Sequence, residues 1–293
     1  MRAVIDIGTN SVLLLLARRG PDGRVHVHSD RSRVSRLGQG VASSGLLDPQ
    51  AVERTLTVLA EYRAIAEAQR ASLEAVATEG LRMARNPEAF LEPAAEILGR
   101  PVRLISGDEE ATLSFRSVAE DRDDDGPLRV VDIGGGSTEL AVGHGTAMLD
   151  RRSHPVGSVR LTERCIHTDP PGPTEIEAVA TAVRATLADQ PLPPHPVLHG
   201  LAGTVTTVAA LLLELPTYDR ERVDGTRASL AQVEALRDRL AGQTLAERGQ
   251  SPMLPAGRAD VIVAGATILL EVLRHCGAQT LVIRDRGLRY ALI

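Results

Sequence analysis

A short strand-and-turn pattern occurs twice in the sequence and limits the folds that are open to it. Residues 4–11 read VIDIGTNS and residues 130–137 read VVDIGGGS, so each segment combines an apolar strand, an Asp-Ile-Gly turn and a serine. Each is followed by a further apolar stretch that we expect to return as the second strand of a hairpin. Two equivalent segments at these positions predict a chain built from two related halves.

The segment just before the second copy is typical of a hinge. Residues 121–127 are charged, lack large apolar side chains and end in Gly-Pro, which favours an exposed connection. Strands alternate with helices on both sides of it, including an amphipathic helix expected over residues 50–71. We therefore predict an α/β fold with one domain over residues 1–122, a second domain over residues 127–293 and a hinge over residues 121–127.

The composition excludes several classes of function. Only 2% of the 293 residues are aromatic and none is Trp, which argues against a nucleic-acid surface built on base stacking. The net charge of −5 gives no overall positive field. The sequence contains no Lys, so all 33 basic side chains are Arg. A catalytic Lys is therefore excluded, whereas Arg is well suited to bidentate phosphate contacts.

The sequence also favours a location inside the cell. The two cysteines show no metal-ligand spacing and no disulfide framework. A strand is expected from residue 3, and the longest apolar run, residues 261–270, is too short to span a bilayer. We expect a soluble cytoplasmic protein that binds neither nucleic acid nor a membrane.

The two repeated turns are candidate phosphate-binding loops. Gly lets the chain bend sharply and lets an anion approach the backbone amides, while Ser, Thr and Asn add side-chain donors. One such turn is as readily a tight hairpin, but two equivalent turns favour phosphate binding. The candidate residues are Gly8, Thr9, Asn10 and Ser11 in the first turn, and Gly134, Gly135, Gly136, Ser137 and Thr138 in the second.

Acidic residues near these turns are candidates for metal binding and for proton transfer. Asp6 and Asp132 end the two strands, and Glu139 follows Asp132 across the turn; these carboxylates either cap turn amides or bind Mg²⁺. The residues at 108–110 (DEE) open a helix just before the hinge. The helix dipole explains acids there, but one of them can also activate a water molecule. The spacing alone does not choose among the three.

Several motifs together resemble the exopolyphosphatase and guanosine pentaphosphate phosphohydrolase family of the actin-like superfamily, in a short form. The matching segments cover essentially the whole chain. They are residues 6–11 (DIGTNS), 81–82 (LR), 105–111 (ISGDEEA), 131–140 (VDIGGGSTEL), 155–161 (PVGSVRL), 200–204 (GLAGT), 258–262 (RADVI) and 285–289 (DRGLR). The resemblance implies two actin-like, RNase H-like domains with a cleft between them.

The resemblance also implies roles for individual residues. Glu110 corresponds to the general base, and Asp132 and Glu139 to carboxylates near a Mg²⁺ or Mn²⁺ ion, while Asp6 remains a candidate metal ligand from its place at the end of the first strand. Arg82 and the turn at Gly203 and Thr204 correspond to further phosphate contacts. The family cleaves one orthophosphate at a time from a chain end, and a homodimer is implied. Arg284 departs from the family, which often has Ser there, and the sequence does not assign it a role.

Three functions follow as hypotheses. The first is Mg²⁺-dependent hydrolysis of the terminal phosphate of inorganic polyphosphate. The second is removal of the 5′ γ-phosphate of guanosine pentaphosphate (pppGpp) at the same site, since both substrates end in a phosphoanhydride. The third is a nucleotide- or phosphate-binding sensor with little turnover; the acidic segment at residues 108–110 argues against it, because a binder has no evident need for those carboxylates.

Overall fold

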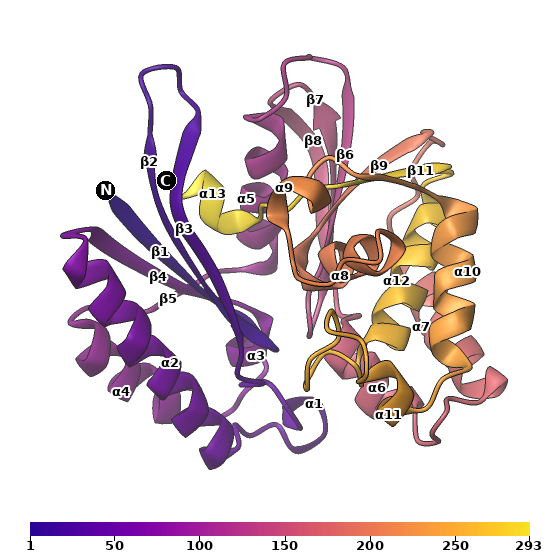
Figure 1. Ribbon diagram of the computed structural model, residues 1–293, viewed down its shortest axis with the longest axis horizontal. Coiled ribbons are helices and arrows are strands. Elements are labelled where there is room, and N and C mark those ends of the chain that lie inside the picture. The colour runs from indigo at the N-terminus through magenta and orange to yellow at the C-terminus, as the bar shows by residue number, and fades with distance from the viewer.

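A computed structural model describes residues 1–293 and contains two mixed β-sheets, each packed against helices (Figure 1). The elements of the first half are β1 (Arg2–Ile7), β2 (Ser11–Arg19), β3 (Val25–Val34), α1 (Val41–Ser44), α2 (Pro49–Ala68), β4 (Ser72–Ala77), α3 (Glu79–Arg82), α4 (Glu88–Leu98), β5 (Arg103–Leu104) and α5 (Gly107–Ala119). Those of the second half are β6 (Pro127–Ile133), β7 (Thr138–His144), β8 (Ala147–His154), α6 (Ser158–Cys165), α7 (Pro173–Leu187), β9 (Val197–Leu201), α8 (Ala202–Leu212), α9 (Arg220–Val223), β10 (Arg227–Ser229), α10 (Leu230–Ala241), α11 (Leu245–Arg248), α12 (Ile262–His275), β11 (Thr280–Ile283) and α13 (Leu288–Ala291).

The five strands of the first sheet and five of the six strands of the second share one topology, and β10 is an additional antiparallel strand at the edge of the second. The strand orders of the two sheets are β3-β2-β1-β4-β5 and β10-β11-β9-β6-β7-β8. Each half begins with three antiparallel strands, after which β4 pairs in parallel with β1, and β9 pairs in parallel with β6. A further parallel strand follows in both, β5 beside β4 and β11 beside β9. The predicted α/β fold and the predicted internal repeat are confirmed.

The third strand of each half was not evident in the sequence. β3 reads VHVHSDRSRV and β8 reads AMLDRRSH, and most residues of both strands are exposed or half-buried. Both are edge strands, paired on one side only. Because an edge strand can leave much of its surface in water, neither needs the apolar pattern by which a strand is recognised.

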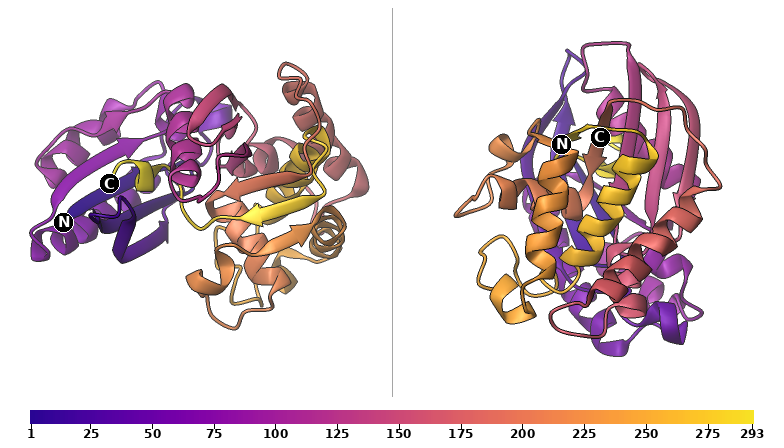
Figure 2. Two further views of the ribbon diagram at one scale, coloured as in Figure 1. Left: turned by 90° about the horizontal axis from the view of Figure 1, so that it is seen from above. Right: turned by 90° about the vertical axis from the view of Figure 1, so that its right-hand side faces the viewer.

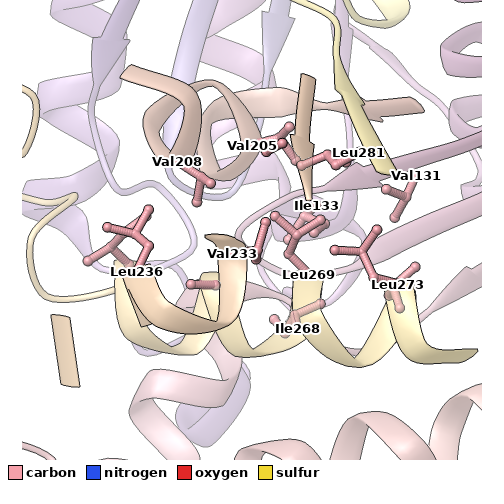
Figure 3. Close-up of a cluster of buried hydrophobic side chains, with 14 of the residues drawn as sticks. Val131, Ile133, Val205, Val208, Val233, Leu236, Ile268, Leu269, Leu273 and Leu281 are labelled. Carbon is pink, nitrogen blue, oxygen red and sulfur yellow. The ribbon is translucent and has the colours of Figure 1, made fainter. Parts of the chain in front are cut away.

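Each sheet has its own hydrophobic core. In the first half, α2 and α4 contribute Leu59 and Phe90 to a cluster with strand residues such as Ile5 and Leu14. The second core is larger and joins β6 and β11 to α8, α10 and α12, with Leu269 of α12 near its centre (Figure 3). No helix combines the length and the apolar composition that crossing a membrane requires.

One helix of each half packs on the sheet of the other. α5 precedes the predicted boundary at 121–127, yet its Phe115 and Val118 pack with Leu128 and Val130 of β6. α13, at the end of the chain, returns to the first sheet (Figure 2). There Tyr290 packs with residues of β1 and β2. The division into residues 1–122 and 127–293 therefore follows the repeat but not the packing of these two helices. Periodicity shows that a helix has an apolar face but not which sheet covers it.

Candidate active site

The two Gly-rich turns meet where the halves come together. They are closed in the same way, because the Gly8 amide donates to the Ser11 carbonyl at 2.9 Å and the Gly134 amide to the Ser137 carbonyl at 3.0 Å. Thr9 packs against the opposite turn: a Cβ on Gly135 would lie 3.0 Å from Thr9 Cβ. A Cβ on Gly136 would lie 2.7 Å from Thr9 Oγ1 and 2.8 Å from Glu79 Cγ. Glycine is therefore required here by the close approach of the other half.

We predict that Gly136→Ala weakens both folding and activity. The added methyl group must displace Thr9 and Glu79, and overpacking of this kind costs about 1–3 kcal/mol. We expect a lower melting temperature and a fall of about tenfold or more in turnover, because the two turns separate. Gly242→Ala is the matched control, since its Cβ would have no neighbour closer than 3.7 Å; equal effects of both substitutions would contradict the prediction.

A cleft of about 820 Å³ lies beside the two turns and between the halves. It is lined by most of the residues that the sequence singled out. These are Asp6, Gly8, Thr9, Asn10, Ser11, Glu110, Asp132, Gly134, Gly135, Gly136, Ser137, Gly203 and Thr204. Residues more than a hundred positions apart thus share one surface because each half brings its turn to the same place.

Three carboxylates lie near the turns: Asp6 and Asp132 line the cleft, whereas Glu139 is buried and does not line it. Asp132 and Glu139 are directly paired across β6 and β7, so their side chains lie on the same face of the sheet. Ser114 Oγ donates to Asp132 Oδ2 at 2.6 Å, and Ser153 Oγ donates to Glu139 Oε1 at 2.7 Å. The other oxygen of Glu139, Oε2, and Oδ1 of Asp6 are buried without a hydrogen-bond partner. Such oxygens are costly to bury unless a ligand satisfies them.

Burial and mutual repulsion raise the pKa values of this group. Burial raises the pKa of Asp6 to about 7, with a further rise from Asp132, while Arg289 lowers it. Burial and the nearby Asp132 raise the pKa of Glu139 to about 8. The pKa of Glu110 is raised well above its ordinary value, first by burial and then by Glu139. A bound cation would oppose all of these shifts.

The carboxylates near the turns fit a cation that takes only part of its ligands from the protein. No three Asp, Glu, His or Cys side chains come close enough to one point to hold a metal by themselves. Mg²⁺ usually takes one or two carboxylates and completes its shell with water and substrate phosphate oxygens. The two unpartnered oxygens, Asp6 Oδ1 and Glu139 Oε2, suit that kind of ion.

We predict that Glu139→Gln stabilises the metal-free protein more at high pH than at low pH. The pKa of Glu139 rises from 4.5 to about 8 on folding. Between these values the folded state binds more protons than the unfolded state, so this group makes the protein less stable as pH rises. Melting temperatures at about pH 5 and about pH 8 would show the difference. As a control, Glu175→Gln should lower stability, because hydrogen bonds from Thr168 and Gly172 lower the pKa of Glu175 to about 2.

Arg82 and Thr138 are not placed as the sequence predicted. Arg82 does not line the cleft. Its Nη1 and Nη2 both donate to Glu110 Oε2 at 3.0 Å, Nε donates to Glu79 Oε2 at 3.0 Å, and Nη1 also donates to the Ile105 carbonyl at 2.7 Å. Because both Nη atoms of Arg82 bond to the same oxygen of Glu110, Arg82 holds this carboxylate in one orientation. All three guanidinium nitrogens of Arg82 are thus bonded to Glu79 or Glu110. Thr138 is fully buried and donates to the Val156 carbonyl at 2.6 Å, so its side chain points away from the cleft.

The remaining oxygen of Glu110, Oε1, accepts no hydrogen bond from the protein. Both Arg82 contacts fall on Oε2, and Glu110 lines the cleft although it is only 8% exposed. Burial and Glu139 raise the pKa of Glu110, whereas Arg82 lowers it, and a carboxylate in a cleft with opposed influences of this kind is a candidate for proton transfer. Of the three acids that open α5, Glu109 pairs instead with Arg103, and Asp108 with Arg151 at 3.6 Å.

Three arginines have places that sequence reasoning did not find. Arg258 lines the cleft beside Gly203, donates to Thr207 Oγ1 at 2.9 Å and has no carboxylate partner. Arg289, from α13, also lines the cleft and donates to both oxygens of Asp30 at 2.9 Å. Arg284 forms ion pairs with Asp121 and, at 3.3 Å, with Asp224. Arg284 therefore binds the predicted hinge and not phosphate.

Comparison with known proteins gives one consistent result. Residues 17–293 match the Ppx/GppA phosphatase family. Exopolyphosphatase 2 of Mycobacterium tuberculosis is 37% identical over 287 residues, which cover 93% of this chain and 90% of that protein. The structure of an Aquifex aeolicus member of the Ppx/GppA family has a TM-score of 0.83 at 34% identity, covering 99% of this chain and 95% of the other.

A more distant structure supports the fold alone. An exopolyphosphatase from Cytophaga hutchinsonii has a TM-score of 0.89 at 24% identity, and the match covers 99% of this chain and 95% of that one. Because these structures match over nearly their whole length, the two halves and the cleft between them are features of a shared two-domain, actin-like fold. The predicted fold class is thereby confirmed.

Proposed function

Since this chain belongs to the Ppx/GppA phosphatase family, we propose that it is an exopolyphosphatase, which releases orthophosphate from the end of inorganic polyphosphate. One observation carries the proposal: Glu110 lies in the cleft beside both Gly-rich turns, with one oxygen held by Arg82 and the other free for water. This arrangement supports the proposal, because a carboxylate that accepts a proton would then lie beside turns whose backbone amides can bind phosphate oxygens.

The reaction follows from these positions. Water attacks the terminal phosphorus while Glu110 accepts one of its protons, and the bond from that phosphorus to the bridging oxygen breaks. The products are orthophosphate and a chain that is shorter by one phosphate. The amides of the turns around Gly8 and Gly134 stabilise the negative charge on the equatorial oxygens, and Arg258 adds positive charge at the cleft wall. Positioning and electrostatics therefore supply most of the acceleration.

A divalent cation, Mg²⁺ or Mn²⁺, is part of the proposal. Asp132 would hold it, with Asp6 and Glu139 as further carboxylates, because two of their oxygens are buried without a partner. The ion would neutralise charge on the phosphate oxygens when bound. Among the chain's own groups, Ser114 keeps Asp132 oriented and Ser153 keeps Glu139 oriented through their hydrogen bonds. Titration of Mg²⁺ and Mn²⁺ followed by calorimetry tests the site independently of turnover.

Guanosine pentaphosphate is the second candidate substrate. The wall of the cleft also includes Met253 and Tyr218, and Tyr218 is 46% exposed. Such a wall can accept a nucleoside, which a polyphosphate chain does not need. Orthophosphate release from short and long polyphosphates and from guanosine pentaphosphate, with and without Mg²⁺, tests both proposals. We expect a higher kcat/KM on polyphosphate; a higher value on the nucleotide would reverse the assignment.

We also propose that the enzyme is a cytoplasmic homodimer. The family resemblance supports the dimer, and the absence of a disulfide framework supports a reducing compartment. Light scattering during size-exclusion chromatography should give twice the mass of the chain, and a monomer mass would contradict the dimer. Cell fractionation tests the location.

A further inference from the structure

A row of four charged side chains connects the second half of the molecule to Glu110. Arg160 of α6 donates through Nη2 to Glu79 Oε1 at 2.6 Å. The other oxygen of Glu79 accepts from Arg82 Nε at 3.0 Å, and Arg82 donates through both Nη atoms to Glu110 Oε2 at 3.0 Å. Charges alternate along the row, with two guanidinium groups facing two carboxylates.

The row is shielded from water and touches the second Gly-rich turn. The side chains of Arg160 and Glu79 are each 17% exposed, that of Arg82 is 19% exposed and that of Glu110 is 10% exposed. Ion pairs that are largely desolvated are less screened than surface pairs and lose more when one partner is removed. Glu79 also packs against Gly136, so the row contacts the Gly-rich turn that is a predicted phosphate site.

Arg160 supplies the second of the two positive charges that face the carboxylates of Glu79 and Glu110. Arg82 is the only guanidinium that contacts Glu110, and it divides its nitrogens between Glu110 and Glu79. With Arg160 present, Glu79 has a second cation of its own. Without Arg160, two carboxylates would compete for one guanidinium, and Arg82 would be drawn from Glu110 towards Glu79.

We propose that Arg160 is a positioning residue that acts through Glu79 and Arg82 to fix the orientation of Glu110. Arg160 belongs to the second half of the molecule, whereas Glu79, Arg82 and Glu110 belong to elements of the first half. The contact therefore also links the arrangement of the two halves to the orientation of Glu110. The inference rests on the proposed function, since it assigns Glu110 the proton transfer of that reaction.

A second contact between the halves provides a matched control. Glu163, also on α6, accepts from the Gly40 amide through Oε1 at 3.0 Å. It joins the same two halves but makes no contact with Glu79, Arg82 or Glu110. Glu163→Ala therefore removes a contact between the halves without touching the row of charges.

The test is a comparison of Arg160→Ala in the wild type and in Glu110→Gln, measured as kcat and KM for polyphosphate with Mg²⁺. In the wild type we expect kcat to fall by about 10- to 100-fold with KM little changed, because a displaced Glu110 still permits binding. In Glu110→Gln the same substitution should change kcat by less than about twofold, because the group that it positions is already gone. Arg160→Lys should recover part of the loss, and Glu163→Ala should leave kcat close to the wild-type value.

Two outcomes would overturn the inference alone. One is an equal loss from Arg160→Ala in both backgrounds, and the other is a loss from Glu163→Ala as large as that from Arg160→Ala, which would indicate a general effect on the joining of the halves. No release of orthophosphate by the wild-type protein from any polyphosphate would overturn the proposed function together with the inference.

Discussion

Glu110→Gln should reduce kcat for polyphosphate by about 100-fold or more, the usual contribution of a positioned general base. Glutamine keeps the shape of the side chain and can still accept a hydrogen bond from Arg82, which donates to Glu110 Oε2 in the wild type. It cannot take a proton from water. Since the substitution leaves the turns and their amides in place, KM should change little. Steady-state kinetics of orthophosphate release measures both quantities.

Glu109→Gln is the matched control for this prediction. Glu109 lies one residue earlier in the same turn of α5, but its side chain is 40% exposed and pairs with Arg103 on the surface. Its substitution should leave kcat within about twofold of wild type, as for most surface changes. Glu110→Gln with wild-type turnover, or a large loss in Glu109→Gln, would show that the proton acceptor has been assigned to the wrong residue.

Asp132→Asn should lower kcat/KM by about 100-fold or more if this carboxylate holds the divalent cation, because such an ion contributes several kcal/mol of charge stabilisation. The amide keeps the size of the side chain and can still accept the hydrogen bond from Ser114. It removes one negative charge from a group that also contains Asp6 and Glu139. Calorimetry should therefore show weaker Mg²⁺ binding, and high Mg²⁺ concentrations should restore part of the activity.

Ser114→Ala separates the charge of Asp132 from its orientation. Ser114 Oγ donates to Asp132 Oδ2 at 2.6 Å, and Ser114 is 1% exposed. Loss of such a supporting hydrogen bond typically costs about 10- to 100-fold in metal affinity or activity. The effect should therefore be smaller than that of Asp132→Asn. Undiminished Mg²⁺ binding by Asp132→Asn would remove Asp132 from the proposed metal site.

The internal repeat could be predicted from the sequence because the pattern that reveals it involves only neighbouring residues. An Asp-Ile-Gly turn after a buried strand occurs at Asp6 and at Asp132, and the structure gives both copies the same hydrogen bond and the same place in the sheet. Two repeated turns in one chain are expected to occupy equivalent positions, so the repeat could be predicted without knowledge of the helices, whereas the cleft between the halves was implied by the family resemblance.

The sequence was insufficient where long-range packing decides the outcome. Arg82 follows a strand near the cleft, but only the fold shows that Glu79 and Glu110 occupy its guanidinium. Thr138 follows a Gly-rich turn, but it is also the first residue of β7. Its side chain points towards Val156 and donates a hydrogen bond to the Val156 carbonyl. Arg289 lies about 280 residues from Asp6 in sequence, and the return of α13 to the first half brings it to the same cleft.

The mass and isotope content of the products formed from polyphosphate in isotopically labelled water test the central claim most directly. If Glu110 directs water onto the terminal phosphorus, the label enters the released orthophosphate, and the chains shorten by one phosphate at a time. Glu110→Gln should slow both processes by the same factor. Label that remains on the chain would place the attack on another phosphorus. Internal fragments without orthophosphate would contradict cleavage at the chain end.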